Sequence, residues 1–237
     1  MSNYSGEVLA EVIRDGVVES SHLGFLIALN SDGSVAFKKG DVKAAVYPRS
    51  SIKSVQASGM VRNGLKLEPR LLALVASSHS GSSDHQTGVL EILKSAGLDE
   101  SHLKNIADKP LGESERREWG DKAPTKLAMN CSGKHAGMLA TCVANGWSIE
   151  NYLDPEHPLQ IEIKKELVRL SEESVLKTTA DGCGAPLFLM TMNGLANTAR
   201  NITISSDPVH QQVVSACRAN PMMVAGKDRA KIGRAHV

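Results

Sequence analysis

Aromatic residues are scarce in this chain. Phenylalanine, tryptophan and tyrosine together make up 3% of its 237 residues. Proteins that bind single-stranded nucleic acid stack bases on aromatic side chains, so the shortage argues against such a function. The formal net charge is only +1, which gives little attraction to nucleic acid or to an anionic membrane. We therefore expect no nucleic acid and no membrane among the partners.

Long hydrophobic runs are also absent. No stretch approaches the roughly 20 apolar residues that span a bilayer. The first six residues are polar, unlike a secretory signal. The four cysteines are then expected to be reduced thiols in the cytoplasm. With 41% hydrophobic and 22% charged residues, the composition is that of a soluble globular enzyme.

The order of the predicted elements indicates an α+β fold. Strands are predicted over 7–13, 23–29 and 34–37, and the turn Asn-Ser-Asp-Gly at 30–33 joins the last two as a hairpin. Helical patterns follow, over 51–61, 71–76, 84–96, 132–144, 158–170 and 208–219. Strands that come first, with helices after them, are typical of α+β rather than alternating α/β proteins.

Three of the later segments carry finer expectations. The segment 106–124 is polar and irregular, and the glycine-rich stretch 181–186 is expected to be a loop that opens a helix. In 158–170 the apolar positions repeat at helical spacing and should face inward; they are Leu159, Ile163, Leu167 and Leu170. The charged positions between them should face solvent; they are Glu162, Lys165, Glu166 and Arg169.

The sharpest chemical signal is Ser50, followed three residues later by Lys53. On a helix the two side chains would share one face. A serine hydroxyl becomes a good nucleophile when a neighbouring base takes its proton, and burial can lower the pKa of a lysine enough to make it that base. Backbone N–H groups of the first helical turn can stabilise the oxyanion. The pattern is typical of a serine–lysine hydrolase.

The spacing alone is not specific, because it also joins Ser101 to Lys104 and Ser174 to Lys177. The predicted strand before Ser50 and the helix after it distinguish the first pair from these. Three other polar clusters lie at predicted loop-to-helix junctions, where ligands commonly bind. They are Ser-His-Ser-Gly at 78–81, Cys-Ser-Gly-Lys-His at 131–135 and Asp-Gly-Cys-Gly at 181–184.

The cysteines divide into two kinds. Cys131 and Lys134 share a helix face by their spacing, and Cys183 lies between glycines. Two thiolates, a nitrogen and a water would form a tetrahedral zinc site, but two buried thiols without a metal explain the same pattern. Cys142 and Cys217 lie within helical patterns and are expected to be core thiols.

Two histidines lie beside these clusters. His85 and His135 could serve as ligands or bases, although a hydrogen-bonded structural role explains each more simply.

Taken together, the clusters resemble the asparaginase II family, the Rhizobium-type L-asparaginases. The matching stretches follow the family's order and cover nearly the whole chain; they are 18–22, 48–53, 78–81, 130–138, 153–155, 181–186 and 224–226. The resemblance implies one domain over 1–229 with a fold like serine β-lactamases and glutaminases. It also implies hydrolysis of L-asparagine to L-aspartate and ammonia, and a homodimer.

The resemblance also implies roles for single residues. Ser50 and Lys53 would be the catalytic pair, and Ser80 the second active-site serine, as a proton relay or as the nucleophile itself. The zinc ligands would be Cys131, Lys134 and Cys183, with zinc orienting the substrate rather than generating a hydroxide nucleophile. Asp181 would lie in the outer shell of this site and contribute to substrate binding. Arg49 has two possible roles: it positions the substrate or a loop, or it forms a structural salt bridge.

The chain also departs from the family pattern. Position 82 is serine where an acidic residue is expected, so we expect the support of Ser80 or of the neighbouring helix to differ from the family's. The family's second active-site lysine and its C-terminal sheet strands are expected beyond the matched segments, so the chain is predicted to be truncated, with a non-native tail over 230–237. Without those strands the N-terminal hairpin would expose an edge and an apolar face, which predicts marginal stability.

Two alternative functions stay open. One is another serine–lysine hydrolase, of the glutaminase or penicillin-recognising type. The other is an inactive fragment that only binds zinc.

Overall fold

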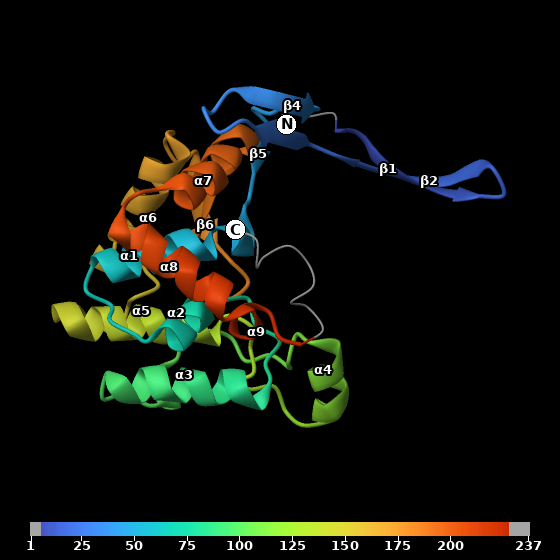
Figure 1. Cartoon of the computed structure of the whole chain (residues 1–237). Coiled ribbons are helices and arrows are strands. Elements are labelled where there is room, and N and C mark those ends of the chain that lie inside the picture. The colour runs from blue at the N-terminus through green and yellow to red at the C-terminus, as the bar shows by residue number, and fades with distance from the viewer. Residues whose placement is uncertain (1–5, 228–237) are drawn as a thin grey trace.

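The computed structural model describes residues 6–227 (Figure 1). The tail predicted to be non-native, 230–237, lies outside these residues. The predicted mixture of antiparallel strands and helices is confirmed. No helix in the described part of the chain is long and apolar enough to cross a membrane.

Strands occur near both ends of the described chain. They are β1 (Glu7–Arg14), β2 (Val17–Gly24), β3 (Leu26–Leu29), β4 (Val35–Lys39), β5 (Ala45–Val46), β6 (Lys177–Ala180) and β7 (Pro186–Thr191). The α-helices are α1 (Lys53–Arg62), α2 (Pro69–Val75), α3 (Ser83–Ser95), α4 (Glu113–Trp119), α5 (Ser132–Asn145), α6 (Pro158–Ser171), α7 (Met192–Ile204), α8 (Pro208–Ala219) and α9 (Pro221–Val224). Two 3₁₀ helices are η1 (Arg49–Ile52) and η2 (Glu100–His102).

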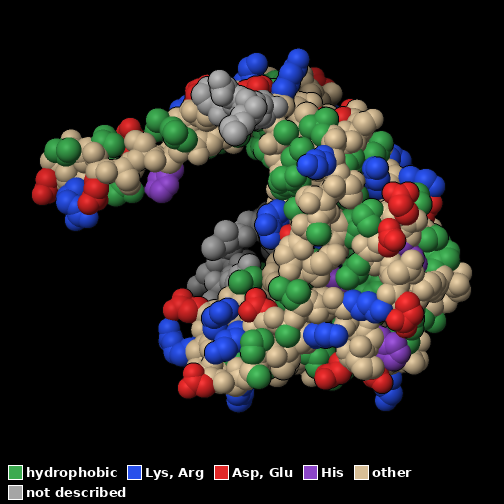
Figure 2. Space-filling model, turned by 180° about the vertical axis from the view of Figure 1, so that it is seen from behind, with side chains coloured by type: hydrophobic (Ala, Val, Ile, Leu, Met, Phe, Trp, Pro, Cys, Tyr) green, Lys and Arg blue, Asp and Glu red, His purple; other side chains and the backbone are tan. Residues whose placement is uncertain are grey.

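The first hairpin, β1–β2, forms an arm that projects from the helical body (Figures 1 and 2). Its turn contains Asp15 and Gly16, both with positive φ, as in the two-residue turns that match the twist of a hairpin. The whole of β1 is exposed, including apolar residues such as Ile13, which is 62% exposed. The arm was only partly predicted, because strand β2 has no clear alternation of apolar and polar residues.

The second hairpin, β3–β4, confirms the predicted turn at 30–33. Arg200 of α7 donates hydrogen bonds to the backbone carbonyl of Ser31, which ties this turn to the body. Val35 and Phe37 of β4 are 48% and 51% exposed. The hairpin therefore exposes apolar side chains, whereas the truncation from which the sequence analysis derived such exposure stays a prediction.

A third sheet, in the order β5–β7–β6, corrects the prediction for residues 181–186. This glycine-rich stretch joins β6 to β7 as a hairpin and does not open a helix directly. Asp181 N donates to Ala185 O at 2.8 Å, and Gly184 has a φ of +86°. A tight turn with positive φ suits glycine. Strand β7 pairs with β5, which lies far away in the sequence, so the local sequence pattern could not predict β7.

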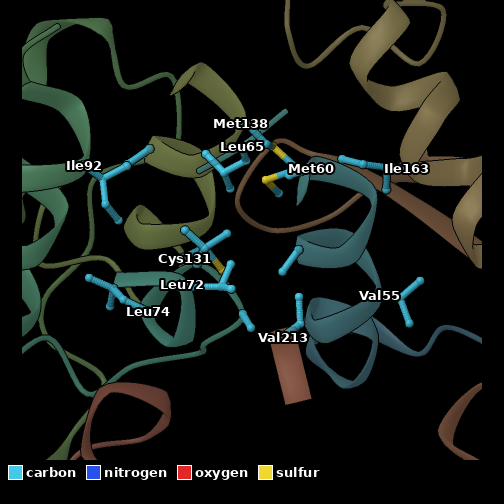
Figure 3. Close-up of a cluster of buried hydrophobic side chains, with 14 of the residues drawn as sticks. Val55, Met60, Leu65, Leu72, Leu74, Ile92, Cys131, Met138, Ile163 and Val213 are labelled. Carbon is cyan, nitrogen blue, oxygen red and sulfur yellow. The ribbon is translucent and has the colours of Figure 1, made fainter. Parts of the chain in front are cut away.

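The hydrophobic core lies among α1, α2, α3, α5, α6 and α8. Figure 3 shows Met60, Leu72 and Met138 from three of these helices pointing toward one another. Gly137 of α5 allows this close packing, because a Cβ there would lie 2.7 Å from Val75. The predicted helices over 51–61, 71–76, 84–96, 132–144, 158–170 and 208–219 are all present within a few residues.

Two helical predictions need correction. Residues 106–124, predicted to be irregular, contain α4. In α6 the four predicted apolar residues are buried, but Glu166 is 3% exposed and does not face solvent. Helix α1 covers that face, and Gly59 lets it approach Ile163 closely. Glu166 is buried against Arg62 of α1 and His210 of α8, which the pattern of α6 alone could not show.

Candidate functional site

Two lysines and two cysteines converge in the interior of the body. Lys53 is the first residue of α1, and Cys131 and Lys134 lie at the start of α5. Cys183 comes from the turn between β6 and β7. All four are at most 4% exposed. The fold therefore brings together four residues that the sequence analysis selected from three separate clusters.

The four side chains form two amine–thiol contacts. Lys53 Nζ lies 3.0 Å from Cys131 Sγ, and Lys134 Nζ lies 3.4 Å from Cys183 Sγ. The two thiols also share a hydrogen bond. Neither lysine has a carboxylate within salt-bridge distance among residues 6–227. Sulfur, not carboxylate, is thus the acidic partner of these buried amines.

This setting changes the proton affinities of the cluster. The hydrogen bond from Cys183 and the charges of Lys53 and Lys134 lower the pKa of Cys131 to about 5, against the opposing effect of burial. The hydrogen bond to Cys131, together with burial, raises the pKa of Cys183. Burial lowers the pKa of Lys53, although the neighbouring Cys131 opposes this. Cys131 also occupies the N-cap position of α5, where the helix dipole favours a thiolate.

The donor atoms suit zinc. Two sulfurs and an amine nitrogen match the borderline-soft character of that ion. Within residues 6–227 no group of three or more His, Cys, Asp and Glu side chains could hold a metal, so a site here needs a lysine ligand. The residues present, Cys131, Lys134 and Cys183, are therefore compatible with zinc only as a mixed thiolate–amine set.

Ser50 lies near this cluster and contacts Lys53 through the backbone, where Lys53 N–H donates to the carbonyl oxygen of Ser50. Its Oγ lies 3.4 Å from Ser78 Oγ, which accepts a hydrogen bond of 2.7 Å from Asn130 Nδ2. No hydrogen bond joins Ser50 Oγ to Lys53 Nζ in the described chain. Ser50 lines a mainly apolar pocket of about 260 Å³, whose far wall comes from α7 and α8.

Arg49 and Asp181 meet each other. Arg49 Nη2 lies 2.7 Å from Asp181 Oδ1, and the two side chains are 63% and 12% exposed. Arg49 has a φ of +48°, which non-glycine residues adopt infrequently. The salt bridge links the turn before Ser50 to the turn that carries Cys183. Of the interpretations left open for Arg49, the structure shows the ion pair.

Ser80 occupies a separate position. It is 1% exposed, and its Oγ donates a hydrogen bond of 2.5 Å to Glu115 Oε1. Ser82 accepts a hydrogen bond from His85 N and caps α3. The unexpected serine at position 82 therefore serves the helix end, while Ser80 is supported from α4.

The remaining polar candidates have structural contacts. His135 Nδ1 lies 2.9 Å from the Tyr152 hydroxyl, and burial lowers the pKa of His135 well below its usual value. His85 Nε2 lies 2.9 Å from the carbonyl oxygen of Met222. Burial raises the pKa of Cys142 to about 12 and that of Cys217 to about 11. The structure thus places both thiols in the core, as expected.

Sequence reasoning missed Asn130 and Glu115 as partners of the serines. Asn130 adjoins Cys131 and was noticed only as part of a matching string. Glu115 lies in the segment predicted to be irregular, 35 residues from Ser80. No local signal could have revealed that contact, because it depends on how the segment folds back on the loop at 78–81.

The comparisons with known proteins identify the family of the chain. A sequence profile of the family described as L-asparaginase II matches residues 10–233, nearly the whole chain. No curated protein matches the chain.

Proposed function

Because the chain belongs to the L-asparaginase II family, we propose that it hydrolyses the side-chain amide of L-asparagine to L-aspartate and ammonia. The observation that carries this proposal is the buried Lys53, which lies within a turn of Ser50 and in contact with Cys131. A lysine whose pKa is lowered by burial is suited to act as a base at neutral pH.

The proposed reaction begins at Ser50. Lys53 accepts the Ser50 proton as Oγ attacks the amide carbon, and returns it to the leaving ammonia; water then hydrolyses the ester. In the structure Lys53 Nζ points to Cys131, so the first step requires Nζ to turn toward Ser50. The Ser50 hydroxyl contacts Ser78 Oγ, which in turn accepts a hydrogen bond from Asn130.

Zinc is part of the proposal, with Cys131, Lys134 and Cys183 as the residues that would hold it. When bound, it would supply a fixed positive charge that orients the substrate. The ion pair between Arg49 and Asp181 would fix the position of the turn beside Ser50 relative to the turn that carries Cys183. We also propose a fold of the serine β-lactamase and glutaminase type, a cytoplasmic location and a homodimer.

The first experiment measures ammonia release from L-asparagine by the chain and by its Ser50→Ala variant. We expect release by the parent and a loss of at least about 1000-fold in the variant, since removal of a nucleophile abolishes the acyl intermediate. Ser174→Ala is the matched control, because Ser174 also precedes a lysine by three residues but is exposed. Appreciable turnover by Ser50→Ala would exclude Ser50 as the nucleophile.

A second measurement tests the metal independently of activity. We expect the purified chain to retain about one zinc per molecule after dialysis, and Cys131→Ser to retain much less. Cys142→Ser is the control, since Cys142 is a buried thiol outside the cluster. Equal zinc content in all three proteins would reject the proposed ligands.

A further inference from the structure

The Ser80 hydroxyl is held by a carboxylate from a distant part of the chain. Besides the bond from Ser80 Oγ to Glu115 Oε1, Gly112 N donates to the carbonyl oxygen of Ser80 at 2.9 Å. Ser114 Oγ donates to the second carboxylate oxygen of Glu115 at 2.8 Å. The segment 112–115 therefore hydrogen-bonds both the backbone carbonyl and the side-chain hydroxyl of Ser80.

Two glycines leave the space that this contact needs. A Cβ at Gly112 would lie 2.0 Å from Glu115 Oε2 and 2.6 Å from Ser80 Cβ. A Cβ at Gly226 would lie 2.3 Å from Ser80 Oγ, and Gly226 has a φ of +100°. No side chain fits at either position unless Ser80 or Glu115 moves. Gly226 also keeps one side of the Ser80 oxygen free of side-chain atoms.

The chemistry of the pair limits what Ser80 can do. Burial by itself would raise the pKa of Glu115, but the hydrogen bond from Ser80 and further hydrogen bonds lower it. An ionised carboxylate only accepts hydrogen bonds, whereas a serine has one donor and two acceptor lone pairs. With its hydrogen committed to Glu115, Ser80 can offer a third group only an acceptor. A carboxylate of lowered pKa is also a weak base and suits proton removal from a serine poorly.

We propose that Glu115 is a positioning residue that holds Ser80 as a hydrogen-bond acceptor for an N–H group of the substrate. Glu115 lines a pocket of about 530 Å³ together with Gly81 and Gly226, so space for a small molecule adjoins Glu115; Ser80 is buried beside this pocket and is not part of its lining. L-Asparagine offers two such groups, the α-ammonium and the side-chain amide. The inference rests on the proposed function and assigns Ser80 to substrate binding, with Ser50 left as the nucleophile.

The test is the kinetics of Glu115→Gln with L-asparagine. Loss of a charge-assisted hydrogen bond should raise KM about 10- to 100-fold while kcat changes less than about threefold. Glu115→Asp should recover part of the loss. Glu113→Gln is the matched control, because Glu113 lies on the same helix but is exposed and does not belong to the lining of this pocket; its KM should equal that of the parent.

A double-mutant cycle separates positioning from a structural role. If Glu115 acts through Ser80, the KM of Ser80→Ala/Glu115→Gln should equal that of Ser80→Ala. Additive losses would overturn the proposal, as would a fall in kcat with an unchanged KM. Succinamic acid, which is L-asparagine without its α-amino group, identifies the N–H group. A KM effect that disappears with this substrate indicates the ammonium, and one that persists indicates the amide.

Gly226→Ala provides a route that leaves Glu115 intact. We expect it to raise KM as Glu115→Gln does, since the new methyl group would displace the Ser80 oxygen. Gly97→Ala is its control, because Gly97 has a φ of +71° with nothing within 4 Å of the added Cβ. An inactive parent would reject the proposed function together with this inference. If the parent is active and Glu115→Gln has the same KM as the parent, only the proposed role of Glu115 is rejected.

Discussion

Helix α1 carries a buried or half-buried cation at each end, and the two ends differ in how the charge is compensated. At the C-terminal end, Arg62 pairs with Glu166 at 3.0 Å and with Asp207 at 2.5 Å. At the N-terminal end, Lys53 is 2% exposed and contacts the thiol of Cys131. One end joins cations to carboxylates, and the other joins amines to sulfur.

The difference separates a structural network from a candidate site. Glu166 receives hydrogen bonds from Arg62 and Arg169, and its Oε1 lies 2.6 Å from His210 Nε2, so α1, α6 and α8 are joined at one carboxylate. Around Lys53 two amines lie close together, which costs folding free energy unless a ligand or a reaction uses them. Within residues 6–227 the buried lysines without a carboxylate partner, Lys53 and Lys134, occur at the cluster that the sequence motifs also selected.

The largest expected effect comes from breaking the network around Glu166. Glu166→Ala should lower the free energy of unfolding by about 3 kcal/mol, because it removes the buried acceptor that Arg62, Arg169 and His210 share, while Arg62 keeps its bond to Asp207. Urea denaturation measures this. Glu162→Ala on the same helix is the control and should change stability by about 0.5 kcal/mol or less. A loss below about 1 kcal/mol for Glu166→Ala would show that the network is not a structural support.

The same carboxylate predicts a pH dependence. Burial would raise the pKa of Glu166, but Arg62, His210 and Arg169 lower it overall. A folded-state pKa below the unfolded value gives stability that is present above the unfolded pKa of about 4.3 and is lost as pH falls through the folded-state value. The unfolding free energy of the parent should therefore decrease below about pH 4.3, and that of Glu166→Gln should decrease less. Parallel profiles would contradict this explanation.

The opposite sign is expected at the other end of α1. Lys53→Met should raise the free energy of unfolding by about 1–2 kcal/mol in metal-free buffer, because an apolar side chain of similar length removes a desolvated amine. The same variant should lose asparaginase activity. Lys165→Met, at an exposed position of α6, should leave both quantities nearly unchanged. Destabilisation by Lys53→Met would mean that the amine–thiol contacts support the fold.

The smallest effect is expected at the Arg49–Asp181 salt bridge. Arg49 is 63% exposed, and an exposed ion pair contributes about 0–1 kcal/mol. Arg49→Ala should therefore change thermal stability little, with Lys104→Ala as a control because it breaks another exposed ion pair, Lys104–Glu150. A change in KM without a change in stability would show that the pair positions the turns beside Ser50 and Cys183. If the kinetics of Arg49→Ala are the same as those of the parent, the ion pair is a surface contact that does not affect catalysis.

The fold was predictable where local pattern carried the information. The long helices follow from apolar spacing, and the hairpin at 30–33 follows from its turn residues. The sheet β5–β7–β6 was missed because β5 has two residues and pairs with a strand about 140 positions later. Helix α4 was missed because its seven residues, Glu113–Trp119, include no buried residue, so no apolar stripe marks it.

The sequence by itself determined the family and the clusters that make up the candidate site, because short motifs record residue type and order. Only the tertiary structure decided which members touch. It paired Lys53 with Cys131, Arg49 with Asp181 and Ser80 with Glu115, and it buried Glu166 against Arg62 and His210 of other helices. Each of these contacts joins segments far apart in the chain, and its free energy depends on desolvation and neighbouring charge, which exist only once the helices have packed.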